Sequence, residues 1–176
     1  PESRGGEMKC RHTLTRGRLE FTFEAEEADV KNIESLSYSM TDEIVYFVLP
    51  EEINEIHPDL LGLAAILLCN PFVGDELILP LPVSRNFFEG ASRVISRYNI
   101  IENVDESILP ITKEESVRPG LAFSGGADSA AALAIMPAST VPIFLNRPMV
   151  ESNRYDSDAP LKICKMLADS GYEVHI

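Results

Sequence analysis

Apolar and polar residues alternate along residues 1–116 in a pattern that predicts a small α+β unit. The predicted elements are strands over 10–14, 18–23, 43–49, 76–81, 100–101 and 108–111, and helices over 58–68 and 85–98. The first two strands flank Thr15-Arg16-Gly17, which is typical of a hairpin turn. The helix over 58–68 is largely apolar, so we expect it to be buried, and it is too short to span a bilayer.

Prolines and charged residues mark the limits of these elements. Pro80 and Pro82 place the strand over 76–81 near an edge of its sheet, because proline cannot donate to a neighbouring strand. The acidic stretch 24–29 predicts a solvated face or loop. The apolar face of the helix over 85–98 consists of Phe88, Ala91, Val94 and Ile95. Residues 113–119 are polar and predict a link to a second unit.

Residues 117–176 follow a different pattern, in which short apolar runs alternate with helical segments. The predicted order is a strand over 121–123, a glycine turn, a helix from 129 that stops before Pro137, a strand over 140–145, a loop over 146–157, a helix capped by Ser157 or Asp158, and a strand over 172–176. Gly171 ends the second helix, and Leu161, Cys164, Leu167 and Ala168 form its sheet-facing side. This β-α-β-α-β order predicts a parallel sheet.

The glycine turn, Ser124-Gly125-Gly126-Ala127-Asp128-Ser129, carries the candidate chemistry. A turn between a strand and a helix directs backbone N–H groups and the positive end of the helix dipole to one point, where a phosphate can bind. Gly125 and Gly126 allow close approach, and Ser124 and Ser129 add hydroxyl groups. Asp128 would repel a phosphate unless a divalent cation lies between them. A plain tight turn, with Asp128 as the helix N-cap, is the alternative.

The hexapeptide resembles the SGGxDS signature of the PP-loop ATP pyrophosphatase superfamily, the adenine nucleotide alpha-hydrolase-like proteins. The Walker sequence G-x-x-x-x-G-K-[ST] and the dinucleotide sequence G-x-G-x-x-G are both absent. Many members of the family carry Ser or Thr directly after the motif, where this chain has Ala130. One hydroxyl contact to phosphate would therefore be missing, and the motif could be altered in chemistry or weaker in binding.

The resemblance implies an activity. Members cleave ATP between the α and β phosphates, adenylate a carbonyl or carboxylate oxygen, and let a nitrogen or sulfur nucleophile displace AMP. It implies ATP and Mg²⁺ as ligands and a small-molecule substrate that undergoes amidation, nitrile formation or thiolation. The residues that would bind pyrophosphate are Ser124, Gly125, Gly126, Ala127, Asp128 and Ser129. Asp128 and Ser129 would be the catalytic residues, and Asp128 would bind the metal.

Residues that follow the second strand could complete the site. The resemblance implies that the adenine lies at the end of the strand over 140–145 and its loop, where Asn146 and Arg147 stand. Arg147, Arg154 and Lys162 are the candidate cations of a phosphate rim, although each alone is more typical of an ordinary surface charge. Arg118 stands at the opposite end of the first strand, so we expect a structural role for it.

Composition narrows the class of protein. The net charge of −13 argues against nucleic acid, whose phosphates require Lys and Arg. Cys10, Cys69 and Cys164 are far apart and odd in number, which indicates a reduced, cytoplasmic protein. Cys10 and His12 could share a metal, but an incidental pair on one strand is the simpler interpretation. His57 precedes Pro58 at a helix start, where a capping or surface role is expected.

The predicted fold class is therefore α/β: a parallel-sheet, Rossmann-like nucleotide-binding unit of PP-loop type over 117–176, preceded by a smaller α+β unit over 1–116. The sheet of a doubly wound domain usually has more strands than the three predicted here, so we expect the unit to be truncated and inactive alone. Its last strand would be an open edge that self-associates or pairs with a partner chain. The alternatives to an enzyme are a nucleotide-binding regulatory or assembly module and a structural domain without a nucleotide.

Overall fold

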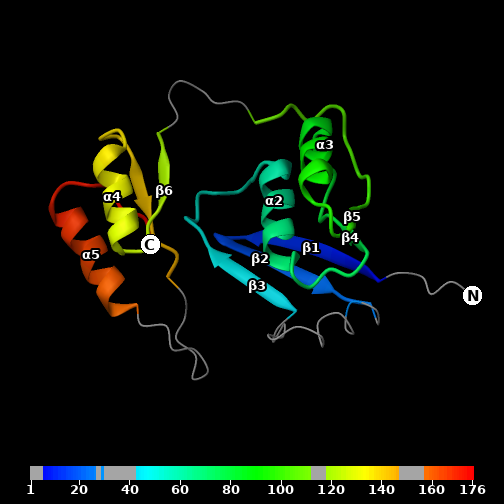
Figure 1. Cartoon of the computed structure of the whole chain (residues 1–176), viewed down its shortest axis with the longest axis horizontal. Helices are drawn as coiled ribbons and strands as arrows, with labels where there is room; N and C mark the ends of the chain where they lie inside the picture. Colours follow the sequence, from blue (N-terminus) through cyan, green and yellow to red (C-terminus); the bar gives the residue numbers. More distant parts are fainter. Residues whose placement is uncertain (1–5, 27–28, 30–42, 112–117, 147–156) are drawn as a thin grey trace, which may run out of the picture. The chain divides into compact units, whose positions relative to one another are not determined.

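The computed structural model describes residues 6–26, 29, 43–111, 118–146 and 157–176 (Figure 1). The chain divides into two compact units, Pro1–Thr112 and Lys113–Ile176, and each has its own apolar core. The predicted boundary between residues 116 and 117 falls within 112–117, outside the described residues. Both units combine β-strands with α-helices, as expected for an α/β protein.

The first unit is built on a five-stranded mixed sheet in the order β3-β2-β1-β4-β5. Its strands are β1 (Glu7–Thr15), β2 (Arg18–Glu24), β3 (Ile44–Val48), β4 (Glu76–Ile78) and β5 (Asn99–Ile100). The β3-β2 and β2-β1 pairs are antiparallel, whereas the β1-β4 and β4-β5 pairs are parallel. Figure 1 shows the helices α2 (Pro58–Cys69) and α3 (Arg85–Val94) of this unit.

The predicted hairpin is confirmed. Thr15 pairs with Arg18, so the loop holds only two residues, and both have positive φ, 46° for Arg16 and 74° for Gly17. This conformation matches the twist of the flanking strands. A Cβ at Gly17 would lie 2.5 Å from the Leu49 carbonyl oxygen, so glycine is required there on two counts.

Alternate residues of β1 and β2 form the core of the first unit. Met8, Cys10, Leu19, Phe21 and Phe23 are buried on one face of the sheet, with residues of α2 packed against them. The expectation of a buried α2 holds for one side only, because Leu60, Leu63 and Leu67 are exposed. Helix α3 ends at Val94, not at Tyr98, and Val94 is exposed, whereas Phe88, Ala91 and Ile95 pack on the core as predicted.

Three predictions in the first unit are wrong in detail. Strand β4 is shorter than predicted, because it ends at Ile78, before the prolines; it does lie near an edge of the sheet, with only β5 outside it. Residues 108–111 form no strand, because Asp105 accepts hydrogen bonds from the backbone and hydroxyl of Ser107 and turns the chain. Asp29, in the acidic stretch, is fully buried, where its carboxylate accepts a 2.7 Å hydrogen bond from the Gly74 N–H.

The second unit contains the predicted β-α-β-α order. Strands β6 (Gly120–Ala122) and β7 (Val141–Ile143) are parallel, and the helices are α4 (Ala127–Ile135) and α5 (Asp158–Asp169). Figure 1 shows both helices on the same side of the small sheet, where Phe123, Leu133, Phe144 and Cys164 form the core. The predicted third strand is reduced to one parallel bridge, between Ile143 and His175.

Helix α5 ends as predicted. Gly171 has a φ of 93°, the Tyr172 N–H donates to the Leu167 carbonyl and the Gly171 N–H donates to the Ala168 carbonyl, which is a Schellman motif. On its sheet-facing side Cys164 is buried and Leu161 and Leu167 are partly buried, but Ala168 is exposed. Among the described residues, no helix is long and apolar enough to cross a membrane.

Candidate functional site

The glycine loop leaves the carboxyl end of β6 and leads directly into α4. The Phe123 N–H donates a 2.8 Å hydrogen bond to the Ile143 carbonyl, so the loop begins at the last point where the two strands pair. Gly125 then takes a φ of 75°, which turns the chain away from the sheet. The carboxyl ends of parallel strands are where ligands of open α/β sheets bind.

The two serines of the loop face each other across the turn. Their hydroxyl oxygens lie 3.2 Å apart, and the Ser129 hydroxyl donates a 3.0 Å hydrogen bond to the Gly126 carbonyl. The Gly126 N–H makes a long, 3.4 Å contact with the Ser124 hydroxyl. These contacts close the loop on itself and hold the two hydroxyl groups beside the backbone N–H groups.

Helix α4 begins with no side-chain cap. Its N-cap residue is Gly126, and no side chain there accepts a hydrogen bond from the first turn. The N–H groups of Ala127, Asp128 and Ser129 therefore point out of the helix with no acceptor in it. Asp128 stands in the first turn and not at the cap, so the alternative in which Asp128 merely caps a tight turn is wrong in that respect.

The start of α5 forms a wall of the loop. A Cβ at Gly125 would lie 3.0 Å from the Cα of Pro160 and 3.5 Å from the Ile163 side chain. Ser157, at the N-cap position of α5, is buried, and its side chain also makes no capping hydrogen bond. Two helix N-termini are thus close together, and their dipoles add to the positive potential at the loop.

Only some of the polar and charged residues that the sequence predicts for the nucleotide site lie within the described residues. Asp128 is exposed at the loop, Lys162 is exposed on α5, and Asn146 is exposed two residues beyond the buried Phe144. Arg147 and Arg154 lie outside the described residues. Arg118 has the expected structural role, since its Nε donates to the Ser139 carbonyl at 3.0 Å and its guanidinium pairs with Glu173.

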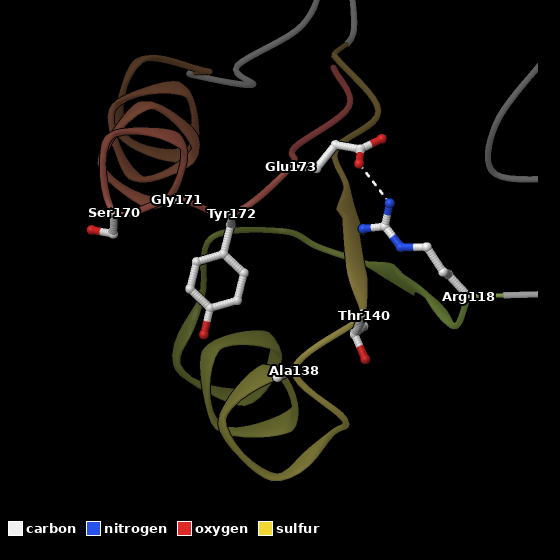
Figure 2. A pocket seen from close by; sticks show the side chains of 7 residues that line it. All are labelled: Arg118, Ala138, Thr140, Ser170, Gly171, Tyr172 and Glu173. Carbon is white, nitrogen blue, oxygen red and sulfur yellow. Dashed lines mark hydrogen bonds and ion pairs between the residues drawn. The ribbon is translucent and has the colours of Figure 1, made fainter.

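A hollow of about 300 Å³ lies near Arg118, at the other end of the sheet (Figure 2). Its lining includes Arg118, Thr140, Tyr172 and Glu173, and the Arg118 guanidinium lowers the pKa of the Glu173 carboxyl. The Thr140 hydroxyl is buried and has no hydrogen-bond partner among the described residues. Nothing in the sequence pattern points to this hollow, and it shares no residue with the glycine loop.

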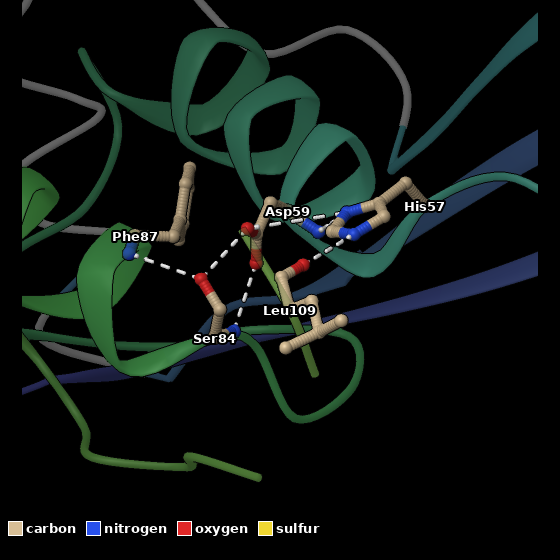
Figure 3. Close-up of polar contacts among 5 residues, drawn as sticks. All are labelled: His57, Asp59, Ser84, Phe87 and Leu109. Carbon is tan, nitrogen blue, oxygen red and sulfur yellow. Dashed lines mark hydrogen bonds and ion pairs between the residues drawn. The ribbon is translucent and has the colours of Figure 1, made fainter. Parts of the chain in front are cut away.

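In the first unit, a cluster of His57, Asp59 and Ser84 contains the residue types of a hydrolase triad (Figure 3). The Ser84 hydroxyl donates to the Asp59 carboxylate at 2.7 Å and accepts from the Phe87 N–H at 3.2 Å. His57 Nδ1 accepts from the Asp59 N–H, and its other ring nitrogen lies 3.0 Å from the Leu109 carbonyl. Because Ser84 bonds to the aspartate and not to the histidine, the cluster is a pair of helix caps, not a nucleophile and its base.

The three cysteines are buried in the cores, whereas His12 is partly buried on β1. Burial raises the pKa of the Cys10 and Cys69 thiols, the latter to about 12, and lowers the pKa of His12. A protonated thiol is a poor metal ligand. Among the described residues no three His, Cys, Asp or Glu side chains converge on a possible metal position. At the glycine loop, a metal ion would therefore be held by the Asp128 carboxylate together with oxygens of its ligand.

Comparison with known proteins identifies no relative of this chain. No protein-family model, no curated protein and no solved structure matches the chain. The case for function therefore depends on the glycine loop.

Proposed function

We propose that the second unit binds the phosphates of ATP and belongs to an ATP-dependent enzyme that forms AMP and pyrophosphate. The observation that carries this proposal is the uncapped N-terminus of α4, presented by a glycine loop at the carboxyl end of a parallel strand. The positive φ of Gly125 and the paired hydroxyls of Ser124 and Ser129 support it, because each adds a donor or a close approach for anionic oxygens.

Each loop residue has a role in the proposed reaction. A carbonyl or carboxylate oxygen of a small substrate attacks the α-phosphorus, and the bond from that phosphorus to the bridging oxygen breaks, so pyrophosphate leaves with the electron pair. The backbone N–H groups of Gly126, Ala127 and Asp128 would stabilise the charge on pyrophosphate. The hydroxyls of Ser124 and Ser129 would bind its terminal oxygens. A nitrogen or sulfur nucleophile then displaces AMP from the adenylated substrate, in an amidation, nitrile formation or thiolation.

The donors at the loop suit magnesium better than most metals. Mg²⁺ is commonly bound by one or two carboxylates, with phosphate oxygens and water completing its shell. Asp128 is exposed in the first turn of α4 and would supply that carboxylate. When bound, the ion would neutralise phosphate charge during the displacement.

Calorimetry of the whole chain with magnesium and ATP tests the proposal. We expect Asp128→Ala to abolish the magnesium-dependent part of binding, whereas Asp169→Ala, in the last turn of α5, leaves it intact. Equal affinities of the two variants would refute the assignment. In a product assay of the full-length enzyme with candidate carboxylates and ammonia, any turnover should yield AMP and pyrophosphate, and ADP with phosphate as the only products would exclude α–β cleavage.

A second candidate is a nucleotide-binding module that does not turn ATP over. Ala130 favours it, because the position after the motif offers no hydroxyl group. This candidate predicts magnesium-dependent ATP binding without AMP release under any substrate condition. Binding together with AMP release would rule it out.

A further inference from the structure

The outer edge of β3 is a strand edge with no partner among the described residues. The strand is the first in the sheet order and pairs only with β2. Its sequence, Ile-Val-Tyr-Phe-Val, is uncharged and consists of β-branched and aromatic residues. Such an edge can pair with another strand unless it is blocked by charge, proline or a bulge.

The hydrogen bonds of β3 show which backbone groups face outward. Glu43 accepts from the Phe23 N–H, and the Leu49 N–H donates to the Gly17 carbonyl, so odd-numbered residues bond to β2. In an antiparallel pair these residues alternate with ones whose N–H and C=O point to the other side. The outward groups therefore belong to Ile44, Tyr46 and Val48.

These three residues also carry the exposed apolar side chains of the strand. Their side chains lie on the solvent face, with relative exposures of 49% for Ile44, 47% for Tyr46 and 81% for Val48. On the neighbouring strand Arg18 forms an ion pair with Glu20, and its guanidinium lies 3.9 Å from the centre of the Tyr46 ring. The charges that border the apolar strip are thus already neutralised within the chain.

We propose that β3 pairs with β3 of a second copy of this chain, antiparallel and about a two-fold axis at Tyr46. This register pairs Tyr46 with itself and Ile44 with Val48, so it satisfies every outward N–H and C=O of both strands. It brings Val45 opposite Phe47 and Ile44 opposite Val48, which places apolar side chains against apolar side chains.

Other registers are worse by the same criteria. An axis at Val48 would place Pro50, which has no N–H, opposite Tyr46. With an axis at Ile44, only Ile44 among the three outward-facing residues would have a partner within the described strand. With the axis at Tyr46 the flanking Glu43 lies opposite Leu49, so no like charges face each other across the dimer.

Cysteine cross-linking of the whole chain tests both the dimer and its register. In a pair of hydrogen-bonded residues the Cα atoms lie about 5.5 Å apart, within the range of a disulfide. We expect Tyr46→Cys to form a disulfide dimer under mild oxidation, and Ile44→Cys alone to form none. A mixture of Ile44→Cys and Val48→Cys should cross-link. The wild type, whose cysteines are buried, is the control.

Sedimentation supplies an independent readout. The wild type should be dimeric at micromolar concentration, and Ile44→Lys, which places a charge on the strip opposite the neutral Thr22, should raise the dissociation constant about tenfold or more. Thr13→Lys, exposed on β1 of the same sheet face, should leave the dimer unchanged. A monomeric wild type, or cross-linking of Ile44→Cys with itself as fast as Tyr46→Cys, would overturn the proposal.

Discussion

Replacing Gly125 by alanine should destabilise the second unit through two separate effects. A φ of 75° costs a residue with a Cβ about 1–2 kcal/mol. The new Cβ would also lie 3.0 Å from the Cα of Pro160, and such crowding costs about 1–3 kcal/mol. The unfolded chain loses flexibility, which offsets about 0.4–1 kcal/mol. The net loss in the free energy of unfolding is then about 1–4.5 kcal/mol.

Two other glycines of the same unit separate these effects. Gly171→Ala has a φ of 93° and nothing within 4 Å of its Cβ, so it should show the backbone cost alone. Gly126→Ala has a φ of −82° and meets only the Ser124 hydroxyl oxygen at 3.5 Å, so it should change stability by less than about 0.5 kcal/mol. The loss of unfolding free energy should therefore be largest for Gly125→Ala, smaller for Gly171→Ala and smallest for Gly126→Ala.

Amide hydrogen exchange of β6 and α4 measures these losses in the second unit alone. A loss of about 1–4.5 kcal/mol lowers the protection of their most protected amides by roughly 5-fold to 2,000-fold, up to the limit set by the stability of the unit. Amides of β1 and β2, in the other unit, serve as the internal control. If Gly125→Ala and Gly126→Ala exchange alike, the described loop conformation is wrong.

Three further predictions concern the first unit. Gly90→Ala, in the interior of α3 with nothing within 4 Å of its Cβ, should raise the unfolding free energy by about 0.5–1 kcal/mol in a urea titration, and a loss would contradict an open helix face. Ser84→Ala should lower the unfolding free energy by about 2–4 kcal/mol, because α3 loses its N-cap and the buried Asp59 loses a hydrogen-bond donor. Ser107→Ala is the control, with an expected loss of about 1 kcal/mol. A smaller loss than this for Ser84→Ala would refute the capping role of Ser84. Burial lowers the pKa of His12, so the unfolded chain takes up a proton near its ordinary pKa of 6.5 before the folded one does. Stability should fall as the pH drops below about 6.5, and the melting temperature of His12→Gln should fall less between pH 7 and pH 5, whereas parallel pH profiles would exclude this contribution.

Local sequence signals account for much of the fold. The hairpin follows from a glycine between two alternating runs, and the end of α5 follows from Gly171, because both depend on backbone conformations that few residues other than glycine adopt. The strand, turn and helix around Ser124–Ser129 were also predictable from residue order. In each case the determining residues lie within a few positions of the feature they specify.

The errors arise where distant contacts decide. Asp29 belongs to an acidic stretch that predicts exposure. Its carboxylate is buried because it accepts a hydrogen bond from the N–H of Gly74, 45 residues away in the sequence. Residues 108–111 have strand-like composition, but the turn at Asp105 and the contact of the Leu109 carbonyl with His57 hold them outside the sheet. The contact of Pro160 with the glycine loop could not be predicted from the neighbouring sequence, because it depends on the packing of α5 against the loop.

The central claim is that the glycine loop is an anion site for magnesium and ATP, and an amide chemical-shift titration with these ligands tests it most directly. We predict that the largest changes occur at the N–H groups of Gly126, Ala127 and Asp128, and that Asp128→Ala removes the magnesium dependence of the changes at Gly126 and Ala127. Changes confined to the hollow around Arg118 and Tyr172, or no changes at millimolar ATP, would contradict the claim.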